Sequence, residues 1–178
     1  MKTILKACFS LCAAFGAVTL FGATARAQAD LLSGKKPFRL KIGGYFPTSG
    51  NTKSDFGKNL VAGGLSYRPL KLIPLDLYTD YTEASKNGNK LQIFDFGVST
   101  RHSLLPISLP IGGPYIEGGL GYYNVKVGGG GTKSRIGGKV ALGYESPIGI
   151  FGEAEYDIIT KVNGYDPSGY RLNIGYRF

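Results

Sequence analysis

The last nine residues constrain the fold of this chain more than any other segment, because they alternate strictly between apolar and polar positions. The apolar set is Tyr170, Leu172, Ile174, Tyr176 and Phe178, and the set between them is Arg171, Asn173, Gly175 and Arg177. Successive side chains of a strand point to opposite faces, so this segment predicts a β-strand with one apolar face that runs to the final residue. An amphipathic strand of a soluble sheet would alternate in the same way, and the rest of the chain has to separate the two interpretations.

The first residues have the organisation of an export signal. Lys2 and Lys6 give a basic start, residues 7–21 are almost wholly apolar, and Ala25-Arg26-Ala27 supplies small residues for a signal peptidase. The apolar run is shorter than the roughly 20 residues that a transmembrane helix needs. We therefore predict a signal peptide at residues 1–27 and one exported domain at residues 28–178.

The predicted mature chain has a restricted chemistry. Both cysteines, Cys8 and Cys12, lie in the signal segment, which excludes disulfides, thiol catalysis and cysteine metal sites from the domain. Removing 27 of 178 residues leaves 178 − 27 = 151, enough for one domain, and removing Lys2, Lys6 and Arg26 leaves 18 basic and 12 acidic residues, a net charge of +6. Because these charges are spread singly along the strands, we expect no nucleic-acid partner and predict attraction to outer-membrane lipid and lipopolysaccharide phosphates.

The mature sequence reads as eight strands without a helix. The predicted strands are residues 37–46, 57–68, 72–82, 90–101, 114–127, 133–146, 149–160 and 169–178, separated by stretches rich in Gly, Pro, Asn and Ser. Their lengths suit transmembrane barrel strands, which need about 9–11 residues. The odd-numbered connections are polar and predicted to be longer, whereas residues 68–71 and 146–149 are short turns. The fourth connection, residues 102–114, is long and apolar and does not fit that alternation.

The two faces of the predicted strands differ sharply in chemistry. One face carries charges of both signs interleaved with glycines, including Gly119, Gly121, Gly137, Gly143 and Gly175, and this composition suits a narrow barrel lumen. We predict a lumen charge network of Lys139, Glu153, Glu155, Asp157 and Arg171. A regular hairpin across residues 146–149 sets Lys139 opposite Glu155 or Asp157, and the next hairpin brings Asp157 beside Arg171.

The opposite face is apolar and carries tyrosines near the strand ends. These are Tyr45, which is slightly off the parity of this face, and Tyr67, Tyr81, Tyr122, Tyr144 and Tyr176. We predict that they form an aromatic girdle at the edges of a membrane.

A search for catalytic chemistry gives weak candidates. His102 is the single histidine, and Ser103, Ser108 and Glu117 are the partners that a Ser-His-Glu set would need. A turn histidine explains this segment better. Glu153, Glu155 and Asp157 lie on one face of a strand about 7 Å apart, which favours salt bridges over a calcium site. Residues 128–131 lack the context of a phosphate loop. We predict no catalytic residue, no metal, no cofactor and no enzymatic activity.

The signal segment, the eight strands, the segment from Pro114 to Tyr122 and the close Gly175-Tyr176-Arg177-Phe178 resemble the small eight-stranded outer-membrane β-barrels of the OmpX, OmpW and OmpA membrane-domain kind. The resemblance implies an all-β, eight-stranded, antiparallel up-and-down transmembrane barrel in a Gram-negative outer membrane, as a monomer or loose oligomer. It also implies that Tyr176 and Phe178 form a signal for the barrel-assembly machinery. It transfers no ligand-binding residue to this chain.

Two classes of function follow from these patterns. The first is a non-enzymatic outer-membrane protein with a structural, loop-display or adhesion role. The second is an exported barrel that binds or conducts a small apolar ligand. A lipid A-modifying enzyme is a weaker third interpretation, because the segment around His102 lacks the required spacing.

Overall fold

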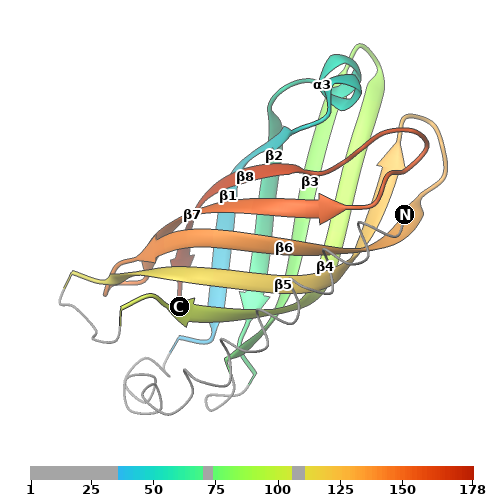
Figure 1. Ribbon diagram of the computed structural model, residues 1–178. Helices are drawn as coiled ribbons and strands as arrows, with labels where there is room; N and C mark the ends of the chain where they lie inside the picture. The colour runs from blue at the N-terminus through green and yellow to red at the C-terminus, as the bar shows by residue number, and fades with distance from the viewer. Residues whose placement is uncertain (1–35, 70–73, 106–110) are drawn as a thin grey trace.

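The computed structural model describes residues 36–69, 74–105 and 111–178 and shows eight antiparallel strands that close into a barrel in sequence order (Figure 1). The strands are β1 (Phe38–Pro47), β2 (Leu60–Tyr67), β3 (Leu75–Lys86), β4 (Asn89–Ser103), β5 (Gly113–Val127), β6 (Lys133–Glu145), β7 (Ile150–Ile159) and β8 (Gly169–Arg177), with a helix α3 (Gly50–Phe56) between β1 and β2. Closure comes from β8, which pairs with β1 along nine residue pairs from Arg39↔Arg177 to Pro47↔Gly169. The predicted eight-stranded up-and-down barrel is confirmed.

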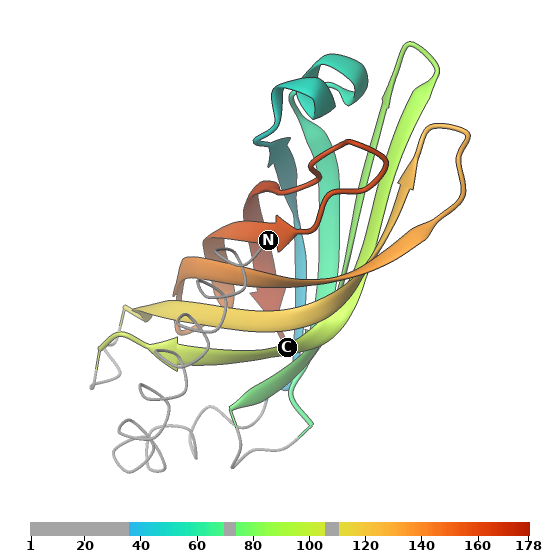
Figure 2. The ribbon, with the colours of Figure 1, turned by 45° about the vertical axis from the view of Figure 1, so that its right-hand side comes forward.

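The two ends of the barrel differ in their connections. Phe38 and Phe178 exchange backbone hydrogen bonds of 2.9 Å, so both ends of the described barrel lie at one rim, which we call the terminus-side end. Helix α3 and the β3–β4, β5–β6 and β7–β8 connections lie at the opposite rim, which we call the loop-side end. The β3–β4 and β5–β6 hairpins project beyond this rim (Figure 2). The predicted signal peptide with Cys8 and Cys12 lies outside the described residues, as does Ser108.

Two sequence predictions about the connections are wrong. Residues 50–56 form a helix of seven residues, although none was predicted; it buries Thr52 and Phe56, and two buried positions are too few to reveal a helical period. The third connection is a turn of two residues, because β3 continues to Lys86, which pairs with Asn89. Asn87 and Gly88 adopt φ values of 50° and 82°, as the inverted turns of tight hairpins require.

The outer surface of the barrel is apolar. Large side chains at alternate strand positions remain exposed on it, among them Ile42 at 62%, Ile136 at 71% and Leu172 at 55%. Aromatic rings cluster near its edges: Phe38 stacks on Tyr67 and Phe178 with centroids 4.8 and 5.8 Å apart. Within the residues that the structure describes, no helix has the length and apolar character needed to cross a membrane.

One tyrosine of the predicted girdle was assigned to the wrong face. Tyr45 is fully buried and points into the barrel, because it shares the parity of Arg39 and Lys41 on β1. Tyr67, Tyr81, Tyr122, Tyr144 and Tyr176 do lie on the outer face, each with 38% or more of its surface exposed.

Candidate functional site

The interior of the barrel is filled by side chains from all eight strands, and its two ends are chemically different. Charged residues occupy the middle and the terminus-side end, whereas apolar residues occupy the loop-side end. Inward residues are set by strand parity, so each element contributes every second side chain to this interior.

Arg171 of β8 is the centre of the charged region. Its guanidinium lies against four carboxylates: Nη1 is 2.9 Å from Asp80 Oδ2 and 3.3 Å from Glu155 Oε1, Nη2 is 3.0 Å from Asp95 Oδ1, and Nε is 2.9 Å from Asp157 Oδ2. All five side chains are 1% exposed or less. Asp80 and Asp95 are direct partners across β3 and β4, where two like charges repel. Arg171 bridges them and removes that conflict.

Two lysines complete this central group. Lys139 Nζ lies 3.1 Å from Asp80 Oδ2 and 3.4 Å from Glu155 Oε2, and Lys41 Nζ lies 2.9 Å from the same Glu155 oxygen. Lys139 pairs with Asp157 in the β6–β7 ladder and Arg171 pairs with Glu155 in the β7–β8 ladder. The β6–β7 register expected from the hairpin arithmetic is therefore present, and β7 supplies acids between two basic strands. Across β7 and β8 the register differs from the expectation, because Arg171 lies opposite Glu155 and the ladder partner of Asp157 is Gly169.

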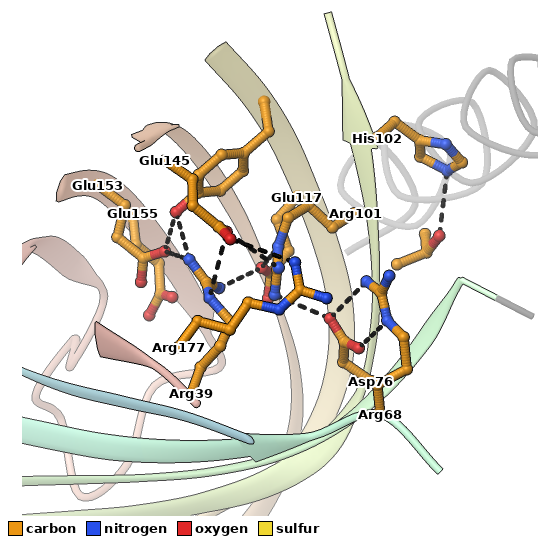
Figure 3. A network of polar contacts seen from close by, with 12 residues as sticks. Arg39, Arg68, Asp76, Arg101, His102, Glu117, Glu145, Glu153, Glu155 and Arg177 are labelled. Atoms are coloured by element: carbon orange, nitrogen blue, oxygen red, sulfur yellow. Dashed lines mark hydrogen bonds and ion pairs between the residues drawn. The ribbon is translucent and has the colours of Figure 1, made fainter. Parts of the chain in front are cut away.

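A second group of charges lies toward the terminus-side end (Figure 3). Arg101 bridges Asp76 at 2.8 Å and Glu117 at 3.1 Å, and Arg39 contacts Glu117 at 3.4 Å and Glu153 at 3.5 Å. The Arg39 guanidinium also lies 3.6 Å from the Phe151 ring centroid, which gives it a cation–π contact in addition to its ion pairs. Arg68 and Arg177 close the rim through Asp76 and Glu145, at 2.7 and 3.2 Å.

The lumen network is larger than the sequence predicted. The structure places all five predicted residues, Lys139, Glu153, Glu155, Asp157 and Arg171, inside the barrel. Among the described residues the network comprises eight carboxylates and seven cations: Asp76, Asp80, Asp95, Glu117, Glu145, Glu153, Glu155 and Asp157 with Arg39, Lys41, Arg68, Arg101, Lys139, Arg171 and Arg177. The sequence patterns did not single out Asp76 and Asp80, although their spacing of four residues places both on the same face of β3.

The loop-side end of the lumen is closed by an apolar plug. It consists of the buried residues Tyr45, Phe56, Leu60, Ala62, Ala84, Leu91, Ile93, Tyr123, Val125, Ile159 and Val162. Helix α3 contributes Phe56 to it, and the β7–β8 connection contributes Val162 together with Tyr165, whose ring meets Phe56 edge-on at 5.3 Å. The Tyr45 hydroxyl donates to the Pro167 carbonyl and ties the same connection to the barrel wall.

A polar contact holds the two parts of the plug together at the surface. Tyr165 Oη donates to Asp55 Oδ2 at 2.7 Å, and Ser54 Oγ donates to Asp55 Oδ1 at 2.7 Å. These hydrogen bonds, that from Ser54 first, lower the pKa of Asp55 from its ordinary value of 3.8.

The inward glycines make room mostly for aromatic rings. A Cβ at Gly121 would lie 2.3 Å from Tyr78 Oη, and one at Gly143 would lie 2.4 Å from the Tyr115 ring. Gly137 faces Tyr123 and Gly175 faces Phe151 in the same way. Gly119, in contrast, has Lys139 and Ser99 as its side-chain neighbours, as expected for glycines that accommodate charged groups.

The hydrogen bonds of the described residues considered for catalysis lead to other partners. His102 Nε2 lies 3.0 Å from Thr100 Oγ1, whereas Ser103 Oγ donates to the Leu105 carbonyl at 2.9 Å. Glu117 is bound by Arg101 and Arg39 in the lumen. Across the described ranges, no group of three or more His, Cys, Asp or Glu side chains is arranged to hold a metal ion.

Comparisons with known proteins identify the fold. No family model matches the chain, and no curated protein matches it. Among solved structures, Neisserial surface protein A has a TM-score of 0.56 and 18% identity over 79% of this chain and 94% of its own. The outer membrane protein Ail of Yersinia pestis has 0.53 and 11% over 81% and 100%, and the N-terminal β-barrel domain of Pseudomonas aeruginosa OprF has 0.51 and 14% over 80% and 98%. The chain thus has the fold of the eight-stranded transmembrane barrels.

Proposed function

We propose that this protein is a non-enzymatic integral outer-membrane barrel of a Gram-negative bacterium, which anchors and displays its loop-side end in a structural or adhesion-type role. The observation that carries the proposal is the inversion of polarity across the barrel wall. The inner wall holds the charge network, whereas the outer wall exposes Ile42, Ile136 and Leu172. Such a surface suits lipid, where closure of the sheet satisfies every backbone hydrogen bond. The similar structures include outer-membrane proteins, which supports the location.

Lipopolysaccharide and outer-membrane lipid are the proposed partners of the loop-side end. This end carries a cationic excess: Lys53, Lys58, Lys86, Lys90, Lys126, Lys133, Arg135 and Lys161 against Asp55, Glu83 and Asp166, or 8 − 3 = +5. The lumen network contributes 7 − 8 = −1, so most of the net charge of the mature chain lies where phosphates of the outer leaflet would meet it.

A role in display accounts for the filled interior better than conduction does. The charged groups are paired, and the apolar plug occupies the loop-side end above them. The alternative function, binding or conducting a small apolar ligand, would require this plug to move. We therefore expect the barrel to support no measurable ion current in a planar bilayer. A steady conductance in the wild-type protein would favour the alternative.

Cell fractionation tests the location directly. The protein should be recovered with the outer membrane, and the folded barrel should migrate differently from the heated protein on electrophoresis. Denatured protein, which migrates the same way before and after heating, is the control for the gel. Recovery of the folded protein in the soluble periplasm would contradict the proposal.

A further inference from the structure

We propose that the outer wall from β8 to β5 carries a binding site for one anionic, phosphate-bearing lipid, with an acyl chain in a groove over Gly63 and the headgroup at Gln92 and Lys126. This inference rests on the proposed membrane location. The proposal places lipid binding on one side of the barrel, whereas a general attraction of lysines to phosphate would favour no particular side.

The groove results from a missing side chain on β2. Gly63 pairs with Ile42 of β1 and with Tyr81 of β3, and all three positions face outward. Val61 and Leu65 stand on either side of the glycine along β2. The resulting groove has a volume of about 890 Å³, which lies within the range of small-molecule sites, about 300–1,000 Å³. Its walls are apolar and include Tyr81, so an extended hydrocarbon chain fits its chemistry.

A polar cluster closes the loop-side end of this groove. Tyr81 and Glu83 belong to the groove wall, and Gln92 Nε2 donates to Tyr81 Oη at 2.7 Å and to Glu83 Oε2 at 3.2 Å. Lys90 Nζ lies 2.8 Å from Glu83 Oε1 and neutralises it. Gln92 pairs in turn with Lys126 of β5, which is exposed.

The polar cluster has a net positive charge because of Lys126. Among the described residues it has no carboxylate partner, whereas Glu83 and Lys90 cancel each other. A cationic side chain beside an amide group that reaches the Tyr81 hydroxyl of the groove wall matches a phosphate whose acyl chain descends along the barrel. A zwitterionic headgroup would add its own cation and gain less from Lys126.

The chain offers a matched pair of glycine substitutions. A Cβ at Gly63 would meet a single atom within 4 Å, the Lys41 carbonyl oxygen at 3.5 Å, so Gly63→Leu fills the groove without strain in the wall. Gly138 also faces outward and lies on β6, across the barrel from β2, with its nearest atom, the Gly119 carbonyl oxygen, at 3.3 Å. Gly138→Leu therefore makes the same chemical change away from the groove.

The test is native mass spectrometry of the protein released from nanodiscs that contain equal amounts of phosphatidylglycerol and phosphatidylcholine with the same acyl chains. The wild type should retain one phosphatidylglycerol. Gly63→Leu should lose it and Gly138→Leu should keep it. Lys126→Gln should reduce the preference for phosphatidylglycerol about fivefold, which corresponds to about 1 kcal/mol. Lys161→Gln, which removes a charge from the β7–β8 connection, should leave the preference unchanged.

Heat-modifiable migration of each variant separates this proposal from the proposed function. Should Gly63→Leu fail to insert, Gly63→Val fills the same groove with a smaller side chain. Equal retention of the two lipids by an inserted wild type, or equal loss in both glycine variants, would refute the lipid-binding site and leave the membrane location unaffected. A wild type that does not enter the nanodisc would refute both.

Discussion

Replacing Arg171 with Met should lower the free energy of unfolding of the barrel by about 3–5 kcal/mol, which is the cost of removing one partner of a buried ion pair and leaving the other charge uncompensated. Arg171 contacts four carboxylates, and Asp80 and Glu155 would keep Lys41 and Lys139 as partners. Among the described residues, Asp95 and Asp157 have no other cation at ion-pairing distance. Two buried carboxylates would thus lose their compensating charge, which places the expected cost in the upper part of that range.

Urea unfolding of the refolded protein in detergent micelles would measure this cost. The chain has no tryptophan and 12 tyrosines, so tyrosine fluorescence can follow the transition. Lys90→Met is the matched control, because Lys90 and Glu83 form an ion pair of 2.8 Å with side chains 46% and 38% exposed. An exposed pair of this kind contributes about 0–1 kcal/mol.

A double-mutant cycle isolates the electrostatic part of the effect. Asp95→Asn removes one of the two stranded carboxylates, so Arg171→Met with Asp95→Asn should cost less than the sum of the two separate changes. A cost of about 1 kcal/mol or less for Arg171→Met, equal to that of the exposed pair, would mean that water screens the lumen. Strict additivity in the cycle would refute the assignment of Arg171 as the group that compensates Asp95.

Deleting Phe178 should reduce the amount of assembled barrel in the membrane far more than it destabilises barrel that has already folded, because burial of a terminal aromatic side chain contributes only about 1.5–3 kcal/mol. Membrane levels equal to those of the wild type would argue against an assembly signal formed by Tyr176 and Phe178. Replacing Lys139 and Glu155 together should cost less than the sum of the single replacements, because their charges lie 3.4 Å apart; unfolding free energies measure this. The contact between Tyr165 and Asp55 should stabilise the plug above pH 3.8 and be lost as pH falls through the lowered pKa of the folded state. An NMR titration should show that Tyr165→Phe raises the Asp55 pKa, and an unchanged pKa would contradict this.

The sequence predicted the strands and the polarity of most of the wall because both depend on local alternation. On β7, Glu153, Glu155 and Asp157 alternate with Ala154 and Tyr156, and the structure places the acids inside. Period-two alternation also fixes the register across a short turn, which is why the position of Lys139 relative to β7 could be calculated in advance.

The helix and the tight β3–β4 turn could not be predicted for different reasons. Helix α3 has no full amphipathic period of its own and is held by tertiary contacts of Phe56 with the plug. In the β3–β4 hairpin, Ser85 and Lys86 look like loop residues, but both continue the ladder with Lys90 and Asn89. Their exposed side chains carry no sign that the strand projects beyond the apolar wall.

The misassignment of Tyr45 follows from the apolar plug and shows where alternation loses its meaning. In the charged part of the lumen the two faces of a strand differ in polarity, so the sequence reveals which face is inside. Where the plug begins, the inner face is apolar or aromatic as well: on β5, Tyr122 points outward whereas Tyr123 and Val125 belong to the plug. The polarity of Tyr45 is therefore uninformative there, and only its parity with Arg39 gives the correct face. The same loss of contrast in polarity between the two faces marks the level at which packed apolar side chains replace ion pairs in the lumen and close the interior.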